Sequence, residues 1–226
     1  MQHVARRYDV GGGHSVAGIV ALPKARTDTV VVLAHGAGND MTAPLLVSVA
    51  DGLADHGFPT VRFNFPYTER GARAPDPAAV LERCYRAVLA HVRGDRALTA
   101  QRVVIGGKSL GGRMASHVAA AGEPVDGLLF LGYPLHPAGR PDQLRAAHLE
   151  RIRAPMLFLS GTRDALCRLD LLRATLKRLP RARLHVVDDG DHSFKVRKRS
   201  GRDPDAVLDE IVTACVAWLR SAVAAA

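Results

Sequence analysis

The chain has 226 residues, 47% of them hydrophobic, and its 31 basic and 22 acidic side chains give a formal charge of +9. This length suits one domain, and the apolar content excludes disorder as the main state. No apolar run approaches the roughly 20 residues of a membrane-spanning helix. Residues 1–25 hold no signal-peptide core, so we expect a soluble, cytoplasmic protein.

Cysteine and arginine usage argues against two further classes of protein. The three cysteines, Cys84, Cys167 and Cys215, include no C-x-x-C pair, so neither a disulfide framework nor a zinc knuckle is indicated. Arginine supplies 26 of the 31 basic residues and is scattered over most of the chain. A nucleic-acid partner is therefore not expected. We also expect no metal and no cofactor, and the sequence leaves the oligomeric state open.

The hydrophobic pattern predicts strands that alternate with helices. Residues 3–10 and 14–22 are expected to form a hairpin around three glycines. Further strands are predicted over 29–34, 59–64, 102–106, 127–132, 155–160 and 183–188. Helices are predicted over 43–56, 76–93, 109–121 and 168–179, with a short one at 141–151 and a last one from Asp203.

This alternation is typical of an α/β fold with a mostly parallel sheet that is covered by helices on both faces. We expect one such domain over residues 1–226. Ligands of such sheets bind beyond the carboxyl ends of the strands, so the residues that follow each strand are candidates for a site.

Gly107-Lys108-Ser109-Leu110-Gly111 follows the strand at 102–106 and matches the nucleophile-elbow pattern G-x-S-x-G. The chain turns sharply from strand into helix there, and the two glycines avoid clashes in the turn. The pattern predicts Ser109 as a nucleophile; the alternative is an ordinary serine in a glycine-rich loop. A phosphate-binding P-loop would need glycine at position 102, which is Arg102.

A serine hydroxyl needs a base that a third group holds in place. Asp164 and His192 follow the strands at 155–160 and 183–188, which gives the chain order Ser, Asp, His of this hydrolase architecture. His192 would take the serine proton, and Asp164 would orient the imidazole. Alone, Asp164 could instead cap a helix or pair with Arg163 or Arg168, and His192 could be a surface histidine. Three other aspartates remain alternative acids: Asp170, Asp189 and Asp191.

The segment His35-Gly36-Ala37-Gly38 follows the strand at 29–34. A tetrahedral intermediate needs backbone N–H donors aimed at its oxyanion. The N–H of Leu110 is one such donor by its position after Ser109, and Ala37 is expected to supply the second. A dinucleotide-binding loop, G-x-G-x-x-G, would need glycine where Met41 stands.

Four segments together resemble the α/β-hydrolase superfamily, and most of all its small dienelactone-hydrolase-like branch, over residues 15–220. They are His-Gly-Ala-Gly-Asn-Asp at 35–40, Gly-Gly-Lys-Ser-Leu-Gly-Gly-Arg at 106–113, Ser-Gly-Thr-Arg-Asp at 160–164 and Asp-Gly-Asp-His-Ser-Phe at 189–194. The branch includes the hydrolase-like domain of a subunit of a eukaryotic histone acetyltransferase complex.

This resemblance implies Ser109 as nucleophile, Asp164 as acid and His192 as base, with Ala37 and Leu110 as the oxyanion hole. The sequence departs from two relatives. Dienelactone hydrolases proper use a cysteine nucleophile, and many lipases have His-Gly-Gly-Gly where this chain has His-Gly-Ala-Gly.

Only about 22 residues separate Gly132 from Pro155, so no large lid fits and we predict an open, shallow site. Tyr67, Tyr133 and Phe65 follow strands and either line this site or pack under loops. Lys108 would favour anionic acyl groups, unless it points away into a salt bridge.

The sequence therefore predicts a serine esterase that cleaves small or accessible acyl esters through an acyl-enzyme, with a small-molecule ester as its partner. A thioesterase, an amidase or a dienelactone-type hydrolase would use the same groups. The alternative of another class is a non-catalytic interaction module that keeps the fold. A basic segment after His192 would serve that module, attract anionic substrates, or simply be solvated: Lys195, Arg197, Lys198, Arg199 and Arg202.

Overall fold

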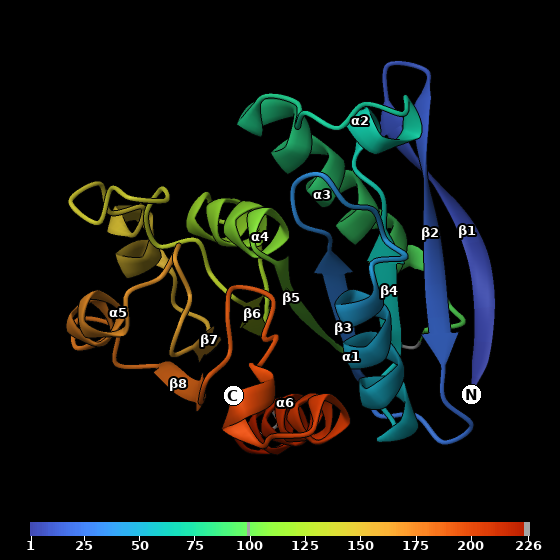
Figure 1. Ribbon diagram of the computed structural model, residues 1–226. Coiled ribbons are helices and arrows are strands. Elements are labelled where there is room, and N and C mark those ends of the chain that lie inside the picture. Colours follow the sequence, from blue (N-terminus) through green and yellow to red (C-terminus); the bar gives the residue numbers. More distant parts are fainter. Residues whose placement is uncertain (99, 224–226) are drawn as a thin grey trace.

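The computed structural model describes residues 1–98 and 100–223 (Figure 1). Residues 99 and 224–226, which belong to the domain expected over 1–226, lie outside the described residues. Eight strands form one sheet: β1 (Gln2–Gly11), β2 (His14–Leu22), β3 (Thr29–Ala34), β4 (Thr60–Phe63), β5 (Arg102–Lys108), β6 (Gly127–Leu131), β7 (Met156–Gly161) and β8 (Ala182–Val187). The α-helices are α1 (Pro44–Asp55), α2 (Pro66–Glu69), α3 (Ala78–Gly94), α4 (Leu110–Ala120), α5 (Leu169–Leu176) and α6 (Pro204–Trp218). Two 3₁₀ turns, η1 (Ala147–Arg151) and η2 (Lys198–Ser200), and a π-helical turn, η3 (Leu219–Val223), complete the described elements.

The order of the strands in the sheet shows where a ligand would bind. The order is β1-β2-β4-β3-β5-β6-β7-β8. β1 and β2 form an antiparallel hairpin, and β2 runs antiparallel to β4, whereas the strands from β4 to β8 are parallel to their neighbours. The chain goes from β3 to β4 on one side and later to β5 on the other side of β3. The carboxyl ends of β3 and β5 therefore form the switch point where ligands of such sheets bind.

Helices cover both faces of this sheet (Figure 1). α1 and α6 pack together on one face with residues such as Leu53 and Ile211. α3 and α4 pack together on the other face with residues such as Tyr85 and Met114. All six residues of β3 are buried, as expected for a parallel strand that is covered on both sides.

The predicted α/β fold is confirmed, and most elements lie within one to three residues of the predicted bounds. Two local expectations need correction. The helix expected over 141–151 is only the η1 turn at its end, and the one-turn helix α2, which Pro66 begins, was not predicted. Because the connection from β6 to β7 holds only η1, the predicted absence of a large lid is confirmed. Within residues 1–98 and 100–223, no helix is long and apolar enough to cross a membrane.

Candidate active site

Ser109 lies in the sharp turn between β5 and α4, as the elbow pattern predicts. Its backbone has φ 50° and ψ −110°, a region that residues other than glycine rarely adopt. The turn presses against the end of β3, because a Cβ on Gly107 or on Gly111 would lie 2.1 Å from the carbonyl oxygen of Ala34. No other residue fits at those two positions without displacing β3, which explains the glycines on both sides of the serine.

A chain of hydrogen bonds joins the three predicted residues. The Oγ of Ser109 lies 2.9 Å from Nε2 of His192. Nδ1 of His192 lies 2.8 Å from Oδ2 of Asp164, whose carboxylate is buried and also accepts the N–H of Leu166 at 2.8 Å. A carboxylate facing Nδ1 favours the proton there, which leaves the lone pair of Nε2 for the serine hydroxyl. The arrangement can therefore activate the serine as a nucleophile.

The alternative acids are engaged elsewhere. Asp189 is bound by the backbone N–H and the guanidinium of Arg197, and these bonds lower the pKa of Asp189 to about 2. Asp191 accepts the N–H groups of Ser193 and Lys195. Asp170 pairs with Arg168, which is therefore not a partner of Asp164.

The two N–H groups expected to form the oxyanion hole lie on segments that meet at Ser109. A Cβ on Gly36 would lie 3.7 Å from Cβ of Ser109, so the loop that carries Ala37 borders the nucleophile. Within the described part of the chain, the N–H groups of Ala37 and Leu110 donate to no protein acceptor. Both are therefore free to bind a ligand oxygen.

His35 anchors this loop, a role that the sequence reasoning missed. The ring is fully buried; its Nδ1 lies 2.9 Å from the carbonyl oxygen of Gly36, and its Nε2 accepts the N–H of Phe65 at 3.1 Å. Burial lowers the pKa of His35, so the ring stays neutral and can donate and accept at once. The signal in the sequence was a histidine directly before the glycines of the loop.

The three aromatic residues that were candidates for the substrate wall are all buried. Tyr133 donates to the carbonyl oxygen of Arg145 at 2.8 Å and packs on Phe130. Phe65 and Tyr67 pack against the ring of His35. Their positions match the alternative of packing under loops.

A cleft of about 250 Å³ is lined by Gly36 and Lys108, which border Ser109, although neither Ser109 nor His192 lines it. Its lining combines apolar residues with two lysines: His35, Gly36, Asn39, Ala43, Pro44, Leu45, Leu46, Lys108, Ser193 and Lys195. Burial lowers the pKa of Lys108 to about 8, although Asp164 and Asp191 oppose this shift. Among the described residues no carboxylate lies within 4.0 Å of either lysine nitrogen, so Lys108 does not point away into a salt bridge, and its side chain lines the cleft.

The basic segment after His192 carries less free charge than its sequence indicates. Arg197 pairs with Asp189, and Arg202 pairs with Glu210. These two guanidinium groups are therefore largely compensated, and Lys195 is the residue of the segment that lines the cleft.

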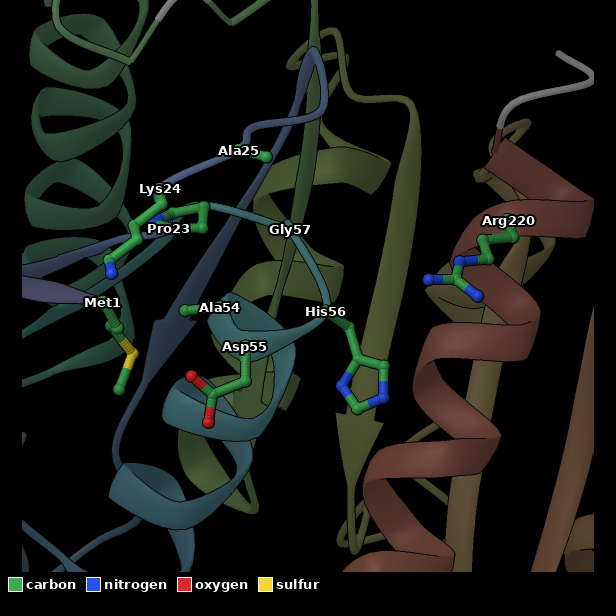
Figure 2. Close-up of a pocket in the computed structure, with 9 residues that line it drawn as sticks. All are labelled: Met1, Pro23, Lys24, Ala25, Ala54, Asp55, His56, Gly57 and Arg220. Carbon is green, nitrogen blue, oxygen red and sulfur yellow. The ribbon is translucent and has the colours of Figure 1, made fainter.

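A second depression, of about 450 Å³, lies at the opposite edge of the sheet, where β3 and β4 begin. Figure 2 shows its nine lining residues, among them Lys24, His56 and Arg220. Ser109, Asp164 and His192 do not line this depression, so it is no part of the candidate active site.

Comparisons with known proteins give the family and the fold of this chain. Residues 27–220 match a family model described as an alpha/beta hydrolase domain. A protein of Aquifex aeolicus, provisionally named a carboxymethylenebutenolidase, is 27% identical over 91% of this chain and 90% of its own length.

Two solved structures share the fold. One is a serine hydrolase without a lid from Xanthomonas campestris, with a TM-score of 0.75 and 23% identity over 97% of this chain and 94% of that one. The other is a dienelactone hydrolase from Anabaena variabilis, with a TM-score of 0.75 and 22% identity over 98% of both chains.

Proposed function

The chain belongs to the alpha/beta hydrolase domain family, and we propose that it is a carboxylic ester hydrolase that works through an acyl-enzyme on Ser109. The observation that carries the proposal is the continuous hydrogen bonding from Ser109 through His192 to Asp164. Such a relay is what acyl transfer needs, because the serine hydroxyl is unreactive without a base that is already oriented.

The proposed reaction uses each of these residues at a defined step. His192 takes the proton of Ser109 as the oxygen attacks the ester carbonyl, and the N–H groups of Ala37 and Leu110 bind the oxyanion that forms. His192 then returns the proton to the leaving alcohol. Water repeats these steps on the acyl-enzyme and releases the acid. Asp164 stabilises the imidazolium in both halves of the reaction.

Hydrolysis of p-nitrophenyl acetate tests this proposal, and the chain offers a matched control. Ser116 also lies 2.7 Å from a histidine nitrogen, Nε2 of His148, but this serine is fully buried and no carboxylate of residues 1–98 and 100–223 bonds that histidine. We expect Ser109→Ala to lower kcat by about 10⁶ and Ser116→Ala to leave kcat within a few-fold. Equal activity of wild type and Ser109→Ala would refute the proposal.

A dienelactone-type activity is the second candidate, and the two unpaired lysines beside the nucleophile favour it. The proteins named above include a carboxymethylenebutenolidase and a dienelactone hydrolase. Lys108 and Lys195 line one small cleft with no carboxylate partner in the described residues, so an anionic group on the substrate would be attracted to two cationic side chains there. A carboxylate-bearing ester hydrolysed faster than its neutral isostere would support this activity.

The family and the relatives named above are hydrolases, so the alternative of a non-catalytic interaction module has no observation in its favour. A Ser109→Ala strain that keeps every function of the wild type would favour it.

The three cysteines are free and buried, which suits a reducing compartment, so we propose a cytoplasmic location that cell fractionation can test.

A further inference from the structure

The cleft beside Ser109 continues outward between two helices. The cleft of about 250 Å³ is the inner cleft. An outer cleft, of about 170 Å³, shares Pro44, Leu45, Ser193 and Lys195 with it. It runs between the amino-terminal turns of α1 and α6, which pack against each other on the same face of the sheet. The path from the nucleophile to solvent is therefore longer than the inner cleft alone.

The outer cleft has a different chemistry from the inner one. Besides the shared residues it is lined by Ser48, Phe194, Pro204, Val207, Leu208 and Ile211. Val207, Ile211 and Phe194 are buried at its floor, whereas Leu45 and Leu208 are half-exposed on its walls. Lys195 is exposed at the junction of the clefts, so its methylenes can cover a bound chain while its ammonium group stays in water.

From this continuity we infer that the outer cleft is a subsite for an unbranched aliphatic acyl chain. The inference rests on the proposed esterase function. If each heavy atom occupies about 30 Å³, the share of a water molecule in the liquid, the inner cleft has room for about eight atoms and the outer one for about six. The two clefts together have room for about fourteen heavy atoms, so an extended chain of six to ten carbons, which does not fill their full width, fits within them.

The acyl side of the ester fits this path better than the alcohol side. The leaving oxygen must face Nε2 of His192 to receive its proton, and the carbonyl oxygen must face Ala37 and Leu110. The inner cleft starts at His35 and Gly36, beside the oxyanion loop, and also reaches Ser193, next to His192; we assign it to the acyl substituent, and the comparison with alkyl acetates below tests this assignment.

A chain-length series of neutral p-nitrophenyl esters, from acetyl to dodecanoyl at micromolar concentration, tests the subsite on the unmodified protein. Each buried methylene contributes about fourfold to kcat/KM, so we expect a rise of at least about 30-fold from acetyl to an optimum between hexanoyl and decanoyl. An optimum at acetyl or butyryl overturns the inference, as does a length preference only in the alcohols of alkyl acetates.

Two variants locate the chain. Ser48→Phe should fill the outer cleft, lower kcat/KM for the octanoyl ester at least tenfold and leave the acetyl ester unchanged. Thr213→Phe, exposed on α6 and outside both clefts, is the matched control and should change neither. Leu208→Ala should lower kcat/KM for the octanoyl ester severalfold by removing apolar contact, so it tests the cleft without adding bulk.

If acetyl esters are hydrolysed but Ser48→Phe and Leu208→Ala keep the wild-type length profile, the subsite proposal is wrong and the esterase proposal stands. If no ester is hydrolysed, the esterase proposal itself has failed.

Discussion

Gly161→Ala probes whether close backbone contact sets the distance between Asp164 and His192. Gly161 ends β7, three residues before Asp164. A Cβ at this position would lie 2.1 Å from the carbonyl oxygen of Gly190 and 2.7 Å from that of Asp191. These are backbone atoms of the segment that leads into His192, so no side-chain rotation relieves the clash. The shortest contact must lengthen by about 1 Å to reach 3.0 Å, below which real Cβ contacts essentially never occur.

A misplacement of about 1 Å at a catalytic group costs about 100-fold in rate. We therefore expect Gly161→Ala to lower kcat for p-nitrophenyl acetate by about 100-fold, and overpacking to cost about 1–3 kcal/mol of stability. The assay is steady-state hydrolysis at a temperature where circular dichroism shows folded protein. Gly94→Ala is the control, because a Cβ there meets nothing within 4 Å. A Gly161→Ala protein with kcat within threefold of wild type and an unchanged Tm would refute this reasoning.

Three further predictions follow from charges in the structure. Asp164→Asn should lower kcat by about 10⁴ with the fold intact, and near-normal turnover would assign the acid to another aspartate. Lys108→Met should lower the preference for a p-nitrophenyl hemisuccinate over a neutral ester about tenfold at pH 7. In wild type that preference should fall as pH rises through about 8, because Lys108 then loses its charge, and it should weaken with salt; a preference independent of pH and salt would contradict this role. Burial, with help from His117 and Arg113, lowers the pKa of His148 to about 4, so the unfolded chain binds more protons between pH 6.5 and 4. The stability that neutral His148 contributes is therefore present above pH 6.5 and lost as pH falls towards 4. Urea unfolding at pH 7 and pH 5 should show this loss in wild type and a smaller one in His148→Gln.

The sheet and the elbow could be predicted from the sequence because their signals are local. A continuous apolar run such as 29–34 specifies a strand buried on both faces, and glycines on both sides of Ser109 specify a turn that presses on a neighbouring strand. Ser109, Asp164 and His192 follow β5, β7 and β8, and this order was enough to predict that they would meet, because the carboxyl ends of parallel strands lie at the same end of the sheet.

The remaining features depend on contacts between distant segments. Tyr133 follows a strand as a wall residue would, but its hydroxyl finds Arg145 and its ring turns inward. The charge of Arg197 is compensated by Asp189 because the loop over 189–197 folds back on itself. The anchoring role of His35 needs the backbone of Phe65, which belongs to another strand connection. The outer cleft between α1 and α6 could not be predicted from the sequence, because its apolar residues follow the same helical periodicity as core residues.

Fluorophosphonate labelling of the purified protein, with the modified residue mapped by mass spectrometry, tests the central claim most directly. A fluorophosphonate reacts only with a serine that is both activated and open to solvent, and the pairs Ser109–His192 and Ser116–His148 differ in both respects. We expect one label, on Ser109, that disappears in His192→Ala and persists in His148→Gln. Absence of label on well-folded protein, or a label on Ser116, would contradict the assignment of Ser109 as the nucleophile.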